Sequence, residues 1–283
     1  MSQADPWGYL LRPAHAFVPL QSSSVTRTLI FAGLTDIGRV RPRNEDHLVL
    51  LDDLGIAVVA DGMGGHPGGD VASRITAQSV ARRLTELLGS TPGGEQGIAS
   101  VLGHAMAESV LDAHALVRME AARKPELARM GTTVTALAMV QTTGDYAIGH
   151  VGDSRAYLLR DGELRQLTRD DTWVQERVDA GDFTVEQGRR HPFGHLLTQC
   201  VGIEDPPEPQ IIVGTALPGD LYMLCTDGLT GALELPDLEQ ILTGHLREDG
   251  RMDAPEAVVR TLLEQAKERG ATDNLTAALL LVA

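Results

Sequence analysis

The pattern of apolar and polar positions predicts short strands followed by a long helix in the first third of the chain. Apolar stretches over 29–33, 47–51 and 55–60, each bounded by turn residues, are typical of strands. From Asp70 onward the apolar residues recur at helical spacing, with Asp70 as a suitable N-cap and Gly89 as a suitable stop. The change of period predicts that the chain leaves a sheet and enters a helix at this point.

The rest of the chain repeats this organisation. A second helix is predicted over 98–123, and Asp161-Gly162 is predicted to form a hairpin turn. A mostly polar helical segment is expected over 170–190. Adjacent strands followed by adjacent helices favour an α+β fold with largely antiparallel sheets over a βαβ repeat. The remaining predicted elements are strands over 132–140, 145–159, 211–213, 221–226 and 275–282 and a helix over 255–269.

Residues 1–26 differ from the rest, because they contain three prolines and three consecutive serines and have no sustained periodicity. We expect a loosely ordered extension, or an arm packed on the domain. No internal repeat or linker interrupts residues 27–283, which we therefore predict to be one domain.

Composition narrows the function classes. The 283 residues include 24 Lys and Arg against 39 Asp and Glu, a net charge of −15, which argues against nucleic acid as a partner. The acidic excess either aids solubility or reflects carboxylates gathered around cations. Only two cysteines are present, and no apolar run approaches the roughly 18 residues of a membrane helix. With no secretory signal, we expect a cytoplasmic protein without a membrane segment.

Acidic turns recur at the ends of the apolar stretches. A single Asp-Gly or Asp-Asn pair is a common turn dipeptide and carries little information. Several carboxylates converging without a cation would force some of them to protonate, and an all-oxygen set suits Mg²⁺ or Mn²⁺. The four turns are Asp61-Gly62, Asp153, Asp227-Gly228 and Asp273-Asn274.

Six motifs in order carry a resemblance to a known family. The chain resembles the PPM (PP2C-type) metal-dependent protein phosphatases, specifically their bacterial branch, over about residues 28–282. The resemblance implies a four-layer α-β-β-α sandwich with the metal centre at one edge of its two sheets, and a flap near 170–195. The motifs are Val40-Arg41-Pro42-Arg43-Asn44-Glu45-Asp46, Asp61-Gly62-Met63-Gly64-Gly65-His66, Gly131-Thr132-Thr133, Gly152-Asp153-Ser154-Arg155, Thr226-Asp227-Gly228-Leu229 and Asp273-Asn274.

The resemblance also implies a set of metal ligands. Asp61 would bridge two cations, Mn²⁺ or Mg²⁺, and a weaker third would be held through Asp153. The first cation would be completed by Asp227 and Asp273. The second would take Glu45 and the carbonyl of Gly62.

Two further residues join Asp61 in the implied catalytic set. Arg41 would grip the substrate phosphate, for which the fixed fork of a guanidinium is well suited. Asp46 would support the water shell. A water shared by two cations has a lowered pKa, so that no phosphorylated protein intermediate is needed.

Some positions have more than one interpretation. His66 is either a proton donor to the leaving serine oxygen or a surface histidine, and the second is favoured. Asn274 belongs to the last motif and is a secondary candidate for the site. His195, beside the flap, is either a local substrate contact or without a role. Gly231 stands where family members commonly carry an acid, which weakens the case for the third cation.

The resemblance implies hydrolysis of phosphoserine and phosphothreonine in proteins, opposing a bacterial Ser/Thr kinase, by a monomer. Two alternatives remain: an inactive member of the fold that binds phosphorylated partners, and a phosphatase of small molecules. The four acids Glu45, Asp61, Asp227 and Asp273 are all present, which argues against the inactive form.

Overall fold

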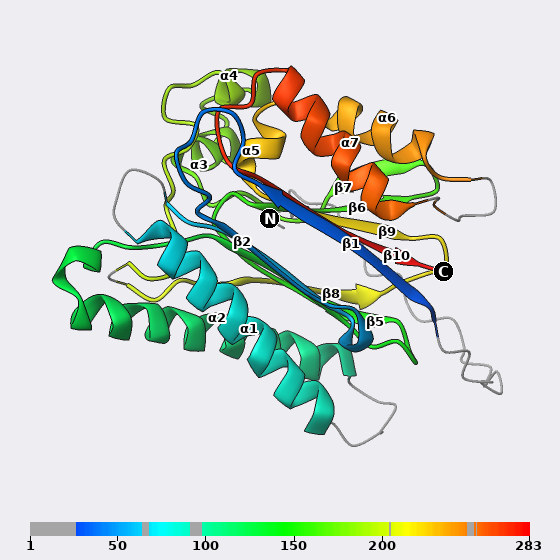
Figure 1. Cartoon of the computed structure of the whole chain (residues 1–283), viewed down its shortest axis with the longest axis horizontal. Helices are drawn as coiled ribbons and strands as arrows, with labels where there is room; N and C mark the ends of the chain where they lie inside the picture. The colour runs from blue at the N-terminus through cyan, green and yellow to red at the C-terminus, as the bar shows by residue number, and fades with distance from the viewer. Residues whose placement is uncertain (1–26, 64–67, 91–97, 204, 248–251, 253) are drawn as a thin grey trace, which may run out of the picture.

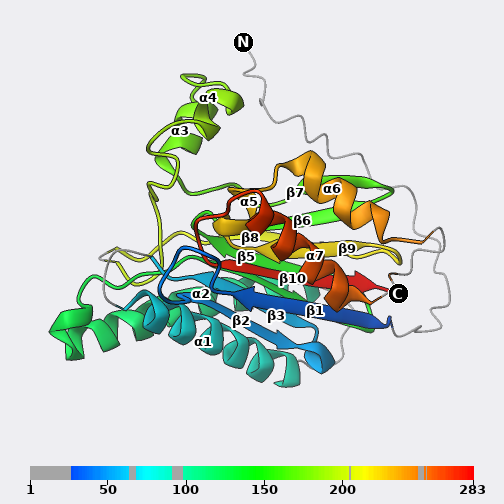
Figure 2. The ribbon, with the colours of Figure 1, turned by 45° about the horizontal axis from the view of Figure 1, so that its top comes forward.

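The computed structural model of the protein describes residues 27–63, 68–90, 98–203, 205–247, 252 and 254–283. Two five-stranded antiparallel sheets pack face to face, and helices cover both outer faces (Figures 1 and 2). The predicted α+β fold in four layers is confirmed. The extension expected over 1–26 lies outside the described residues, so the division into extension and domain stays a prediction.

The first sheet has the strand order β1-β10-β9-β6-β7. Its strands are β1 (Leu29–Asp36), β10 (Leu275–Val282), β9 (Leu221–Cys225), β6 (Arg155–Arg160) and β7 (Glu163–Gln166). Its outer face is covered by α5 (Asp227–Thr230), α6 (Leu235–Gly244) and α7 (Pro255–Glu268) (Figure 1).

The second sheet has the order β2-β3-β4-β5-β8. Its strands are β2 (Asp46–Leu51), β3 (Ile56–Asp61), β4 (Val134–Met139), β5 (Asp145–Val151) and β8 (Gln210–Thr215). The long helices α1 (Gly69–Ser90) and α2 (Ile98–Arg123) cover it, and short 3₁₀ turns lie at Asp52–Leu54 and Pro125–Leu127.

Three hydrophobic clusters fill the three interfaces between the four layers. Strand β10 contributes side chains to two of these clusters, because successive side chains of a strand point to opposite faces of the sheet. Leu279 and Leu281 pack toward the helices of the first sheet, while Leu280 and Val282 pack between the sheets. All of β10 is buried, which explains why it reads as a continuous apolar run.

The described ends of the chain meet in the first sheet. Strand β1 pairs with β10 along its whole length, from Leu29 opposite Val282 to Asp36 opposite Leu275. Just outside this ladder, Thr28 and Ala283 exchange two backbone hydrogen bonds of 3.2 and 2.8 Å. Both ends of the described chain therefore lie at the same end of the sandwich.

Local patterns predicted most elements, with two departures. The helix over 98–123 and the strand over 275–282 are observed with those bounds. The strand expected over 145–159 is wrong as a single element, because the backbone turns at Gly152 (φ 106°) and crosses from β5 in one sheet to β6 in the other. The helices α5 and α6 were not predicted.

The flap, residues 170–195, carries two short helices, α3 (Trp173–Asp179) and α4 (Val185–Arg189). Thr172 and Thr184 cap them by accepting backbone N–H bonds. The ring of Trp173 lies 5.9 Å from Phe183 and 5.3 Å from His191, so aromatic contacts hold the flap together. Within the described ranges, no helix combines the length and the apolar character needed to span a bilayer.

Candidate metal centre

The predicted acids come from both sheets and meet where strands of each sheet end. Asp61 closes β3, and Asp46 opens β2 directly opposite it in the antiparallel register. Asp153 lies in the turn from β5 to β6, Asp227 opens α5 directly after β9, and Asp273 lies just before β10. Positions separated by more than 200 residues are thereby brought to one edge of the sandwich.

Asp61 is a strongly perturbed member of this group of acids. Burial of its carboxyl raises its pKa well above the ordinary value. The negative charges of Asp46, Asp227 and Asp153 raise it further, in that order. Four acids therefore interact electrostatically at one point.

Asp46 is held by two threonines from the other sheet. Thr226 Oγ1 and Thr276 Oγ1 donate to its Oδ2 atom at 2.9 and 2.6 Å. Burial raises the pKa of Asp46 to about 7, although both hydroxyl bonds oppose the rise. Its orientation is therefore set across the inter-sheet interface before any ligand binds.

Two carboxylate oxygens at this edge are buried without a hydrogen-bond partner, Oδ1 of Asp46 and Oδ1 of Asp227. A buried carboxylate oxygen without a partner is costly, and a cation is the group that compensates several at once. The acids here are all hard oxygen donors, which suit Mg²⁺ or Mn²⁺. The donor set therefore fits divalent cations.

The acids do not form a closed ligand cage as they stand. Among the described residues, no three acidic, histidine or cysteine side chains are gathered closely enough to enclose a cation. One reason is visible at Asp273, whose Oδ2 atom accepts a 2.6 Å hydrogen bond from Arg41.

Arg41 contacts this group directly through its hydrogen bond to Asp273. Its hydrogen bond to Asp273 raises the pKa of the guanidinium, and the charges of Glu45 and Asp227 contribute as well. The Arg41 side chain is 39% exposed to solvent. Arg41 thus stands at the mouth of the site, where a phosphate would approach.

Asn274 fixes the loop that carries Arg41 and Glu45. Its Oδ1 atom accepts from the backbone N–H of Glu45 at 2.9 Å, and its Nδ2 donates to the carbonyls of Ile37 and Arg43 at 2.9 Å each. Both amide N–H groups and one lone pair of the amide oxygen are therefore used to hold the backbone of this loop. Asn274 is therefore a positioning residue in this structure.

Gly62 lies where no side chain fits. A Cβ atom there would come within 2.3 Å of the Gly69 carbonyl and 2.7 Å of the Glu45 carbonyl. Its N–H donates to the Glu45 carbonyl at 3.1 Å, which brings the two predicted ligands together. Burial is the main cause that raises the pKa of Glu45, followed by the charge of Asp70.

Hydroxyl side chains support the acids in a way that their sequence motifs did not reveal. Thr133 Oγ1 accepts the N–H of Asp61 at 3.0 Å and lies 2.7 Å from Ser154 Oγ, so it joins two acid-bearing turns. Thr226 and Thr276, which bind Asp46, were also missed. Their only sequence signal is a polar residue at a strand end or inside an otherwise apolar strand.

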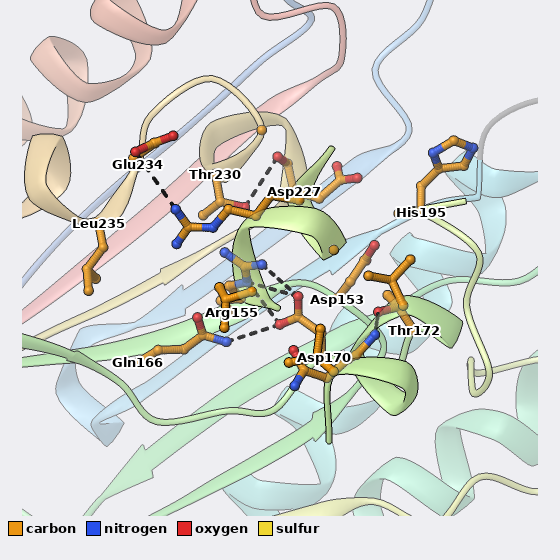
Figure 3. Close-up of a pocket in the computed structure, with 18 of the residues that line it drawn as sticks. Asp153, Arg155, Gln166, Asp170, Thr172, His195, Asp227, Thr230, Glu234 and Leu235 are labelled. Atoms are coloured by element: carbon orange, nitrogen blue, oxygen red, sulfur yellow. Dashed lines mark hydrogen bonds and ion pairs between the residues drawn. The ribbon is translucent and has the colours of Figure 1, made fainter. Parts of the chain in front are cut away.

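Two secondary candidates have different outcomes. His66 lies outside the described residues. His195 is exposed and lines a cavity between the flap and the start of α6, with a volume of about 430 Å³ (Figure 3). Asp153 and Asp227 form one wall of the same cavity, and Gly231 lines it too. The cavity and the metal centre are therefore continuous.

Comparison with known proteins identifies the family. Residues 41–279 match the model of the family described as protein phosphatase 2C. The chain belongs to this family, and the resemblance inferred from its motifs is confirmed.

Among its relatives, the serine/threonine protein phosphatase PstP of Mycobacterium tuberculosis is 36% identical over 254 residues. That match covers 89% of this chain but 45% of the relative, so the chain spans about half the length of this protein. The serine/threonine phosphatase stp of Listeria monocytogenes is 33% identical over 251 residues, covering 87% of this chain and 93% of the relative.

The fold is shared with solved structures as well. The catalytic domain of the serine threonine protein phosphatase PstP, in complex with two manganese ions, superimposes with a TM-score of 0.75 at 32% identity. The match covers 91% of this chain and all of that one.

Proposed function

We propose that the chain hydrolyses phosphoserine and phosphothreonine in proteins with the help of two divalent cations. The observation that carries this proposal is the convergence of buried acids from both sheets, with orphaned oxygens on Asp46 and Asp227. The manganese reported for the solved PstP domain supports the choice of cation.

In this proposal Asp61, Glu45, the carbonyl of Gly62, Asp227 and Asp273 hold two Mn²⁺ or Mg²⁺ ions, and Asp153 contributes to a weaker third site. When bound, the cations would neutralise charge on the phosphate and lower the pKa of water. Gly231 lines the cavity beside Asp227 without offering a ligand, which limits the third site to few protein donors.

The chain's own side chains perform the remaining tasks. Arg41 leaves Asp273 and binds the phosphate oxygens through its guanidinium, which orients the ester. Asp46, held by Thr226 and Thr276 through Oδ2, keeps Oδ1 available to accept a hydrogen bond or a proton from water. Asn274 keeps Arg41 and Glu45 on a fixed loop.

We further propose a cognate bacterial Ser/Thr kinase whose products are the substrates, action as a monomer in the cytoplasm, and no role for nucleic acid. The net charge of −15 supports the last point, since an acidic surface repels a phosphate backbone. A small-molecule phosphatase remains the competing function.

Phosphate release from a phosphothreonine peptide, compared in EDTA, Mg²⁺ and Mn²⁺, tests the proposal. Asp61→Asn keeps the shape of the side chain and should remove metal-dependent release. Asp112→Asn, at an exposed acid of α2, is the matched control and should behave as the wild type. Folded protein that releases no phosphate with either metal would contradict the proposed activity and favour a phospho-binding module.

A further inference from the structure

Asp171 lies at the start of the flap, next to the turn that carries Asp153. Its neighbours Asp170 and Thr172 line the same cavity as Asp153 (Figure 3). We propose that Asp171 is a positioning residue for the metal centre: it holds the turn around Asp153 in place and thereby strengthens the binding of a divalent cation through Asp153. The inference rests on the cation site proposed above and adds a residue that no sequence motif singled out.

Asp171 binds the turn at both backbone groups of Gly152. The Asp171 Oδ2 atom accepts the Gly152 N–H at 2.9 Å, and the Asp171 N–H donates to the Gly152 carbonyl at 2.7 Å. The side chain of Asp171 is 10% exposed, so water competes little for the bond to its carboxylate. Because Gly152 directly precedes Asp153, the two bonds fix the backbone from which the Asp153 carboxyl extends.

The residue after Asp153 is held as well. Thr135 Oγ1 donates to the Ser154 carbonyl at 3.0 Å, and the hydroxyl oxygens of Thr133 and Ser154 lie 2.7 Å apart. These contacts reach the turn from the start of β4, whereas Asp171 reaches it from the flap. Asp153 is therefore flanked on both sides by anchored backbone.

The conformation of Gly152 explains why the turn depends on such contacts. Its φ of 106° lies in a region that glycine adopts freely, and glycine restricts its own backbone little. A Cβ at this position would lie 2.6 Å from Thr133 Cγ2, so the turn is packed directly against Thr133. Thr133 in turn accepts the N–H of Asp61 at 3.0 Å. A displaced turn would therefore change how Asp153 lies relative to Asp61.

Asp171 also joins the two ends of the flap. Its carbonyl accepts the N–H of Thr198 at 2.8 Å, and its Oδ1 atom accepts a hydrogen bond from Gln199 Nε2 at 3.3 Å. The next residue, Thr172, forms a β-bridge with Leu197. Asp171 therefore connects the entry and the exit of the flap to the turn at the metal centre.

The expected size of the effect follows from this arrangement. Groups that orient metal ligands without touching the metal typically contribute about 10–100-fold to metal affinity. Asp171 acts on the backbone of the turn and not on the Asp153 carboxyl itself, so we expect the lower end of this range, about ten-fold.

The experiment measures Mn²⁺ binding directly. The metal-free protein is titrated with Mn²⁺, and the electron paramagnetic resonance signal of the free ion gives the number and affinity of the bound ions. Asp153→Asn identifies the ion held through Asp153 as the one whose binding it weakens. Asp171→Ala should weaken the same ion about ten-fold, while the more tightly bound ions keep their affinity.

Two conservative variants separate position from charge. Asp171→Asn removes the negative charge but keeps an oxygen that accepts the Gly152 N–H, so it should restore Mn²⁺ binding to the wild-type affinity. Asp171→Glu keeps the charge but is one methylene longer, which displaces the contact with the turn. It should weaken the same ion, and it provides the test if Asp171→Ala does not fold.

Asp220→Ala is the matched control for a loss of stability. Asp220 is also a buried carboxylate that accepts the N–H of a turn residue, Leu217, at 2.7 Å. It lies just before β9, at the opposite end of that strand from Asp227. Both alanine variants should lower the melting temperature in EDTA, whereas only Asp171→Ala should change the binding of Mn²⁺.

The outcomes separate the two proposals. The positioning role is overturned if Asp171→Ala, or Asp171→Glu in its place, binds Mn²⁺ as the wild type does. It is also overturned if Asp171→Asn or Asp220→Ala weakens binding equally, or if Asp153→Asn weakens no ion. All of these results leave the phosphatase function intact. A folded wild-type protein that binds no Mn²⁺ would overturn the proposed function and the positioning role with it.

Discussion

The ion pair between Arg155 and Asp170 links the flap to the strand that leaves the metal centre, and its loss should destabilise the protein strongly. Arg155 Nε and Nη2 donate to Asp170 at 2.9 and 2.7 Å. The side chains are 26% and 10% exposed, so the pair is largely removed from water. We therefore choose Arg155→Met, which keeps the apolar stem and removes the donors.

The expected loss in the free energy of unfolding follows from the hydrogen bonds that Asp170 loses in this variant. In Arg155→Met, Gln166 Nε2 remains its only side-chain donor seen in the structure, at 3.1 Å. Breaking a buried pair in this way costs about 3–5 kcal/mol, and the partial exposure of Arg155 moves the expectation to about 3 kcal/mol. Tyr157 also loses a 3.3 Å hydrogen bond from Arg155, which adds to the cost.

The assay is urea denaturation in EDTA, with the free energy of unfolding obtained by linear extrapolation. The double variant Arg155→Met/Asp170→Leu removes the stranded carboxylate and should recover most of the loss. Arg82→Met is the control, because its pair with Glu86 on α1 is 63% and 49% exposed and contributes about 0.5 kcal/mol or less. The reasoning is refuted if Arg155→Met costs no more than Arg82→Met, or if the double variant is less stable than the single one.

Three further predictions concern the metal centre. Asp61→Asn should raise the melting temperature in EDTA, because it relieves the repulsion between buried carboxylates. Its phosphatase activity should fall to a few per cent of the wild-type activity at most. A melting temperature below that of the wild type would contradict this reasoning. Arg41→Ala should raise KM more than it lowers kcat in steady-state kinetics, because phosphate positioning is lost first, and a pure kcat effect would oppose that role. The metal-free protein should lose stability as the pH rises from about 4 to about 7. The pKa of Asp46 is about 7 in the folded protein and 3.8 in the unfolded chain, so the folded state binds the proton more tightly and this advantage disappears when the proton is lost. With excess Mn²⁺, the melting temperature should instead be higher at pH 8 than at pH 5. If the melting temperature still falls with rising pH in Mn²⁺, this would argue against a cation beside Asp46.

The elements of the fold were largely predictable because apolar periodicity is a local property of the sequence. Helix α2 and strand β10 have uninterrupted patterns and were predicted with their observed bounds. The break at Gly152 was missed, since apolar residues continue on both sides of it and only the positive φ reveals the turn. Helix α6 lies between the predicted strand over 221–226 and the predicted helix over 255–269, in a stretch for which no element was predicted.

The candidate site was predictable to the extent that its chemistry is marked by short motifs. The Asp-Gly and Asp-Asn pairs identified the acids that the structure brings to one edge. The supporting contacts were not predictable from any pattern, because they join distant positions: Thr226 contacts Asp46 over 180 residues of sequence and Thr276 does so over 230. Threonine at a strand end has too many structural uses to indicate such a contact in advance.

The hydrogen-bonded meeting of Thr28 and Ala283 has a consequence for how this domain can be attached to other molecules. Strand β10 has eight residues between the acidic edge and Val282, which places the paired ends about 25 Å from the carboxylates. A tether, a fused domain or a surface anchor joined at either end would therefore leave the mouth of the site facing away from its attachment. The same proximity would let a short peptide bridge join Thr28 to Ala283, so the segment from 28 to 283 is open to a circular permutation that keeps the edge with the acids intact.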